Sequence, residues 1–120
     1  FSCVTLILNG CILLPKVDNS QPESTGAIIT FSQNSSLGPG LWADLSVYSE
    51  DLKIIEVFNI MQNRNYDIEH WDANNSYKKV TVVANAKTNE FNGMLVKGRW
   101  KITSSNPSDT GGSLNIKWRR

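Results

Sequence analysis

Apolar and polar residues alternate along much of this chain, and this pattern predicts short β-strands. The alternation is clearest in residues 93–103 and 113–119, where apolar positions interleave with polar or charged ones. The apolar positions are Met94, Val96, Trp100, Ile102, Leu114, Ile116 and Trp118. Because successive side chains of a strand point to opposite faces, each segment presents one apolar face, and we expect the two to pair as a hairpin.

Four further segments are rich in β-branched and aromatic residues and are bounded by turn-forming residues. They are residues 27–33, 42–48, 66–71 and 79–86. Short strands separated by frequent turns are typical of sandwiches and barrels. We expect an all-β, mainly antiparallel fold in the form of a small two-sheet β-sandwich over residues 27–120.

Residues 52–61 fit two patterns. Apolar residues recur there at spacing three, as on one face of a helix, while an overlapping set alternates as in a strand. The helical set is Leu52, Ile55, Phe58 and Met61, and the strand set is Leu52, Ile54, Phe58 and Ile60. Ser49 offers a helix N-cap, followed by two acidic residues in the first turn. We therefore favour one short helix here, with a strand as the alternative.

The composition indicates one globular domain with a packed core. The chain has 120 residues, of which 40% are hydrophobic and 19% are charged, and this balance is far from that of disordered chains. The net charge is +1, but residues 1–72 carry 9 acidic and 3 basic residues whereas residues 73–120 carry 2 and 9. Such asymmetry predicts either a bipolar surface or charges scattered over a solvated surface.

The two cysteines lie in the apolar segment 1–14, which has the length of a signal-peptide hydrophobic region. Leu8-Asn9-Gly10-Cys11 resembles a bacterial lipobox, with residues 1–10 as a signal-peptide remnant, Cys11 as the lipidated residue and 11–26 as a polar tether. Ile12 resembles the residue that follows the cysteine in lipoproteins passed to the outer membrane. The alternatives are a hairpin turning at Asn9-Gly10 and a Cys3–Cys11 disulfide.

The sequence contains no motif that points to catalysis or to a cofactor. Phosphate-loop, dinucleotide-binding and G-x-S-x-G signatures are absent. His70 is the single histidine, so it cannot form a multi-histidine metal site, and we expect it on the surface or at a sheet edge. Asp67, Glu69 and Asp72 could bind calcium, but alternation favours a solvated face for Asp67 and Glu69. We predict a protein that is not an enzyme and has no metal or cofactor.

Basic residues are expected on the outer side of the last two predicted strands. They are Lys97, Arg99, Lys101, Lys117 and Arg119. A stripe of this kind can hold phosphate. Trp100 and Trp118 fall on the apolar face and are expected in the core rather than as stacking platforms, so nucleic acid is not predicted as a partner.

The order of features resembles the outer-membrane lipoprotein family of the type VI secretion system. The similar pieces are the Cys11 lipobox, a first strand and loop, Leu45-Ser46-Val47-Tyr48, Tyr77 with residues 80–84, and Arg99-Trp100. This resemblance implies a transthyretin-like β-sandwich without enzymatic activity. It also implies a lipid-anchored protein on the bacterial outer membrane that faces the periplasm and binds a protein partner in a membrane-associated complex.

In that family the loop after the first strand contacts the partner, and here this loop is residues 34–40. Leu37, Gly38, Pro39 and Trp42 are the implied contact residues. Proline fixes its own φ and the glycines permit positive φ, so that Leu37 can be presented outward. The alternative is an ordinary connection with Leu37 against the core.

Two functions thus follow from the sequence. The first is a non-catalytic, lipid-anchored assembly or binding module. The second is a soluble secreted ligand-binding barrel, similar to lipocalins, in which Trp42, Tyr48 and Trp71 line a cavity.

Overall fold

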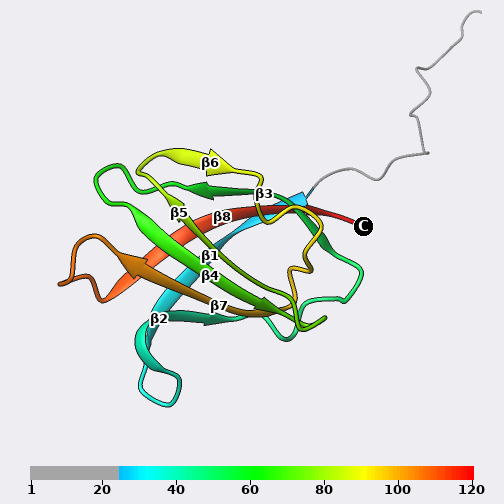
Figure 1. The fold of residues 1–120 in the computed structure, drawn as a ribbon, viewed down its shortest axis with the longest axis horizontal. Helices are drawn as coiled ribbons and strands as arrows, with labels where there is room; N and C mark the ends of the chain where they lie inside the picture. Colours follow the sequence, from blue (N-terminus) through cyan, green and yellow to red (C-terminus); the bar gives the residue numbers. More distant parts are fainter. Residues whose placement is uncertain (1–24) are drawn as a thin grey trace, which may run out of the picture.

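The computed structural model describes residues 25–120, which form eight antiparallel β-strands (Figure 1). The strands are β1 (Thr25–Asn34), β2 (Gly38–Asp44), β3 (Lys53–Asn59), β4 (Tyr66–Asp72), β5 (Tyr77–Val82), β6 (Ala86–Thr88), β7 (Gly98–Ser104) and β8 (Gly111–Arg119). Every recorded strand pair is antiparallel. The predicted all-β, antiparallel class is confirmed.

All eight strands belong to one sheet in the order β5-β4-β7-β2-β1-β8-β3-β6. The sheet curls until its two ends, β5 and β6, lie near one another, so that it forms a nearly closed barrel (Figure 1). The predicted two-sheet sandwich is not confirmed. Alternation along single strands specifies which side chains point inward, but it does not specify how many sheets the strands form.

The predicted helix over residues 52–61 is wrong, because β3 occupies this segment. The pairing of β3 with β8 shifts register between Ile54 and Glu56, which marks a β-bulge. The bulge adds one residue, so that Ile54 and Val57 both point into the core, at 1% and 0% exposure. The spacing of three that we took for a helix therefore marks no buried face, because Ile55 and Phe58 of that set lie outside the core.

The predicted hairpin of residues 93–103 and 113–119 is also wrong. β7 lies between β4 and β2, whereas β8 lies between β1 and β3. Residues 93–97 precede β7, which begins at Gly98. The inward positions were predicted correctly, since Trp100, Ile102, Leu114 and Ile116 are all fully buried. The alternation therefore identified the faces of these strands but not their neighbours.

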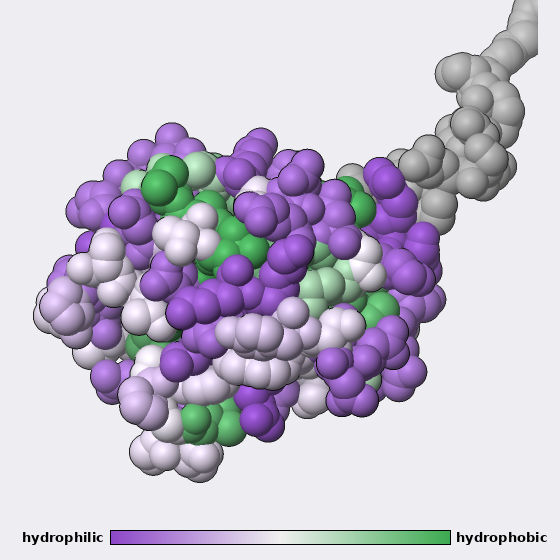
Figure 2. Space-filling model, viewed as in Figure 1, coloured by the Kyte–Doolittle hydropathy of each residue, from purple (hydrophilic) through white to green (hydrophobic). Residues whose placement is uncertain are grey.

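Large side chains fill the interior of the curled sheet. Phe31, Tyr66, Phe91 and Trp100 are each at most 1% exposed and belong to a single hydrophobic cluster with the inward residues of every long strand. Burial of this apolar surface is the main favourable contribution to folding. On the outside, apolar residues appear as small separate patches among hydrophilic ones in the view of Figure 2.

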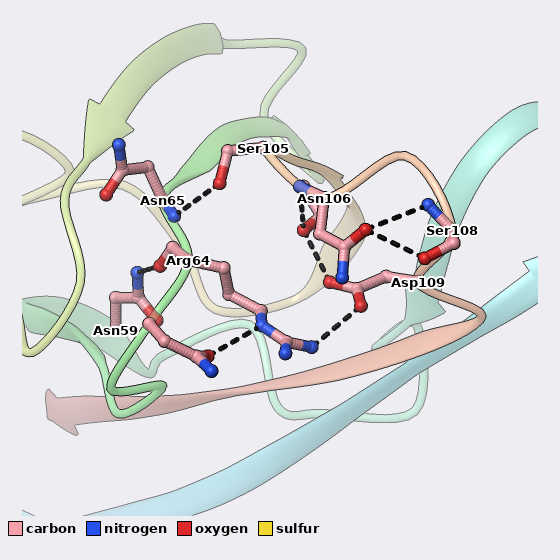
Figure 3. A network of polar contacts seen from close by, with 9 residues as sticks. Asn59, Arg64, Asn65, Ser105, Asn106, Ser108 and Asp109 are labelled. Atoms are coloured by element: carbon pink, nitrogen blue, oxygen red, sulfur yellow. Dashed lines mark hydrogen bonds and ion pairs between the residues drawn. The ribbon is translucent and has the colours of Figure 1, made fainter.

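Side-chain hydrogen bonds cross the gap between β3 and the end of β5. The fully buried Asn59 amide donates to the carbonyl oxygens of Val82 and Val83, each at 3.2 Å, and of Arg64 at 3.0 Å. At the same end of the barrel, Arg64 Nη1 lies 2.7 Å from Asp109 Oδ1 and ties the β3–β4 connection to the β7–β8 loop (Figure 3). The Asn59 side chain thus joins β3 to the end of β5, two strands that no backbone hydrogen-bond ladder connects. We call this junction the seam.

The seam generates a first prediction. Asn59→Leu keeps a similar volume but leaves the carbonyl oxygens of Val82, Val83 and Arg64 without this donor, and the contact with Val82 is buried. The free energy of unfolding should therefore fall by about 2 kcal/mol. Urea denaturation followed by circular dichroism measures the change. Asn115→Leu, at a half-buried position on β8, is the control and should change stability little. Equal stability of Asn59→Leu and the wild type would show that Asn59 does not hold the seam.

Candidate binding surface on the outer face

Three aromatic side chains from three strands meet on the outer face of the sheet. Trp42 on β2 and Trp71 on β4 lie on either side of β7 and contact each other, with ring centroids 5.6 Å apart and an interplanar angle of 23°. Tyr77 on β5 pairs with Trp71 in the ladder, and these ring centroids are 5.2 Å apart. We call Trp42, Trp71 and Tyr77 the aromatic row. Trp71 and Tyr77 remain 37% and 51% exposed.

Strand alternation and register together produce this row. Trp42 lies between the inward Leu41 and Ala43, while Trp71 lies between the inward His70 and Asp72. Both tryptophans therefore point outward. In the ladder Trp42 pairs with Lys101 and Trp71 pairs with Arg99, so that the two indoles can meet across β7.

A glycine allows the close approach of β7 to β4. Gly98 has a φ of +140°, and a Cβ atom at this position would lie 2.3 Å from the carbonyl oxygen of Trp71. Only glycine combines this backbone conformation with the available space. Gly98 also exchanges backbone hydrogen bonds with Leu45, which extends the contact of β7 with the β2 side.

A hollow of about 560 Å³ opens beside the two indoles. Its lining residues are Trp42, Asp44, Ser46, Trp71, Gly98 and Arg99. The Ser46 backbone N–H donates to Asp44 Oδ1 at 3.0 Å, which orients this carboxylate. The hollow thus combines two aromatic rings with one carboxylate and one guanidinium.

Contacts hold the row in place. Trp42 Nε1 donates to the carbonyl oxygen of Gly38 at 3.2 Å, and Lys101 Nζ lies 5.4 Å from the centre of the Trp42 ring. Lys101 also pairs with Glu69 at 3.8 Å. Tyr77 Oη donates to Glu69 Oε1 at 2.8 Å, and this hydrogen bond raises the pKa of the Tyr77 hydroxyl. Such contacts limit the rotamers that the ring side chains can adopt.

The predicted basic stripe does not form. Lys97, Arg99 and Lys101 lie on or just before β7, while Lys117 and Arg119 lie on β8, and β2 and β1 separate the two groups. Carboxylates also approach these bases: Lys97 lies 3.3 Å from Glu50, and Lys117 lies 3.7 Å from Glu56. The stripe was predicted from a hairpin of the last two strands, and these two strands are not neighbours in the sheet.

The predicted partner loop over residues 34–40 is largely a tight turn between paired strands. Gly38 and Pro39 belong to β2, and the Leu37 backbone N–H donates to the Asn34 carbonyl oxygen at 3.0 Å. Leu37 is half-buried and borders an outer hollow of about 370 Å³, which Ile28 and Trp42 also line. A protein contact at Leu37, Gly38 and Pro39 stays a prediction, whereas Trp42 belongs to the aromatic row.

Our placement of His70 on the surface is wrong, because this residue is fully buried. Its ring stacks on Trp100 with centroids 3.8 Å apart, and Nε2 and Nδ1 lie 2.6 and 3.1 Å from the carbonyl oxygens of Leu95 and Arg99. A neutral imidazole has one N–H and can donate to only one of them. Nearby, buried Asp72 accepts hydrogen bonds from the backbone N–H groups of Asn74, Ser76 and Leu95.

The acidic residues on the outer side of β4 interact with side chains of neighbouring strands. Asp67 and Glu69 point outward as predicted, and Asp67 accepts a hydrogen bond from Thr81 at 2.6 Å. Within residues 25–120, no group of three or more histidine, cysteine or acidic side chains gathers as a metal site.

The predicted trio of Trp42, Tyr48 and Trp71 is brought together only in part. Tyr48 packs edge-on against Trp118, with centroids 5.5 Å apart. The two tryptophans meet on the outer face rather than in an internal cavity, since the interior is filled. The sequence analysis did not place Tyr77 beside Trp71. The alternation of β4 places Trp71 on the outer face with Asp67 and Glu69, but the position of Tyr77 next to it depends on the pairing of β5 with β4.

Comparison with known proteins found no matching family model, no matching curated protein and no matching solved structure. Across the described part of the chain, no helix is long and apolar enough to cross a membrane. Cys3, Cys11 and most of the predicted tether lie outside the described residues.

The environment of His70 generates a second prediction. Burial lowers its pKa below the ordinary 6.5, against opposing effects of the Leu95 and Arg99 carbonyls and of Asp72. The unfolded chain therefore takes up a proton near pH 6.5 that the folded protein accepts only at lower pH. The free energy of unfolding should be unaffected by this group above pH 6.5 and should fall as the pH drops from 6.5 to the folded pKa. Below the folded pKa both states carry the proton, and the effect should level off.

Because the chain has one histidine, its imidazole proton signals in an NMR titration are unambiguous. We expect a midpoint below 6.5. A midpoint at or above 6.5 would show that the two carbonyls and Asp72 hold the ring as a cation, and the sign of the stability effect would then reverse.

Proposed function

We propose that this chain is a non-catalytic binding module that a lipid on Cys11 tethers to a membrane and that binds its ligand through the aromatic row. The observation that carries the binding role is the exposure of Trp71 and Tyr77 at a hollow of about 560 Å³, outside an interior of buried aromatic and aliphatic side chains. Large aromatic side chains left exposed and in mutual contact are typical of recognition surfaces.

The rigid framework beneath the row supports the same conclusion. The row lies on four hydrogen-bonded strands, β2, β7, β4 and β5, and not on a mobile loop. Binding residues on such a framework lose little conformational entropy when a ligand is bound. The function therefore depends on shape and contact rather than on a reacting group.

The tether rests on the sequence. The Cys11 lipobox and the polar residues that follow it support attachment to the outer membrane, with the body facing the periplasm. The resemblance to the type VI secretion lipoproteins supports, as a more specific proposal, a protein partner in a membrane-associated complex. In that proposal the turn with Leu37, Gly38 and Pro39 provides the contact.

A second candidate is a soluble secreted binding protein. The nearly closed sheet favours it, since barrels often bind ligands. The packed interior leaves the same outer row as its binding surface, so the two candidates differ only in the tether.

Metabolic labelling with radioactive palmitate in a bacterial host tests the tether, and this is the third prediction. The wild-type chain and Cys3→Ser, the matched control, should both carry label and fractionate with membranes. Cys11→Ser should carry none, because the acyl chains that anchor the protein are missing, and its body should move to the soluble periplasmic fraction. Equal label on Cys11→Ser, or an unlabelled wild type, would overturn the tether and favour the soluble candidate.

A further inference from the structure

We infer that the aromatic row and its hollow form a binding site for a neutral glycan chain. This inference rests on the proposed function and specifies the chemical class of its ligand. Sugar rings present apolar C–H faces that stack on aromatic rings, and hydroxyl groups at their edges that donate and accept hydrogen bonds. The outer face of β2, β7, β4 and β5 offers partners for both kinds of contact.

The rings supply the apolar part of the site. Trp42 and Trp71 stack on each other with an interplanar angle of 23°, whereas the Tyr77 ring is tilted by 41° to that of Trp71. The exposed surfaces of Trp71 and Tyr77, 37% and 51%, are therefore the ones that a sugar ring can cover. A hollow of about 560 Å³ at Trp42 and Trp71 lies within the range of small-ligand sites. Trp71 lines the hollow and the exposed Tyr77 lies next to it outside the hollow, so that a sugar ring at each place would belong to one short stretch of chain.

The polar groups around the rings suit hydroxyl groups. Asp44 offers carboxylate oxygens as acceptors, and Arg99, its direct cross-strand neighbour on β7, offers several N–H donors to the same hollow. Within residues 25–120, no ion pair is recorded for Arg99, whose side chain is exposed. A ligand with both donors and acceptors can satisfy the two groups together, as a sugar does.

The charge of this face argues against a polyanion. Its outward charged residues are Lys79, Arg99 and Lys101, with Asp44, Asp67 and Glu69 among them. These three positive and three negative charges balance, and Lys101 is already paired with Glu69. Nucleic-acid binding depends on unpaired basic residues that neutralise phosphates, so stacking on this row is better matched to an uncharged ligand.

The fourth prediction concerns binding of defined oligosaccharides to the full chain. The probes are the hexaoses of cellulose, chitin, xylan and starch, measured by isothermal titration calorimetry. We expect at least one to bind with a Kd between about 1 μM and 1 mM. Trp71→Ala and Tyr77→Ala, tested separately, should each weaken binding about tenfold or more, because each removes one stacking surface at an exposed position.

Phe58→Ala is the matched control. Phe58 is an outward ring on β3 with Lys87 Nζ 5.4 Å from its centre, as Lys101 lies near Trp42. Its neighbour Asn59 contacts β5 at Val82, the end of that strand opposite Tyr77, so Phe58 lies away from the row. This variant should bind the oligosaccharide like the wild type. Circular dichroism of each variant establishes that the sheet is intact, and the Tyr77 variant, at an edge strand, retains the test if Trp71→Ala unfolds.

Three results would overturn the inference. They are no binding of any probe up to about 10 mM, equal affinity of the folded Trp71 and Tyr77 variants and the wild type, and tighter, salt-dependent binding of a single-stranded oligonucleotide. If the wild-type chain carries palmitate but binds no glycan, only the proposed class of ligand is overturned. Glycan binding by an unlabelled chain would overturn only the tether.

Discussion

The register of β7 between β4 and β2 is the constraint on which the rest of this structure depends. On the inner side it places Trp100 opposite His70, with the rings stacked 3.8 Å apart in the core. On the outer side the same register places Arg99 and Lys101 between Trp71 and Trp42, so that the two indoles meet across the strand. A shift of one residue would exchange the two faces and abolish both the core contact and the aromatic row.

The two faces of this central strand differ: the inner one forms part of the core, and the outer one carries the aromatic row that we propose as the binding surface. The inner face is lined by buried aromatic and aliphatic side chains, and the buried polar side chains of His70, Asp72 and Asn59 bond mainly to backbone groups. The outer face carries the aromatic row, whose rings are not part of the core. An internal ligand would have to displace packed aromatic side chains at considerable cost, whereas the outer row is available without any change in the body.

The sequence predicted the inward and outward sides of most strands correctly, as Trp100, Ile102, Leu114 and Ile116 show. It did not predict the partners of β7 and β8, because their apolar patterns are equally compatible with several strand orders. The bulge between Ile54 and Glu56 turns Val57 inward, and no local pattern predicts it. The two carbonyl groups that surround His70 come from segments distant in the chain. Trp42 and Trp71 were recognised as ligand-contacting candidates, but their outer position depended on a strand order that no local pattern encodes.

The central claim is that binding occurs on the outer face of this barrel and leaves its interior unchanged. The chain contains two tryptophans in the aromatic row and two in the core, Trp100 and Trp118. The direct measurement is an NMR titration of the full chain with an oligosaccharide that binds it, in which the four indole N–H signals are followed. The account predicts that the signals of Trp42 and Trp71 shift while those of Trp100 and Trp118 stay in place. Shifts confined to Trp100 and Trp118 would contradict it, because they would place the ligand inside the barrel.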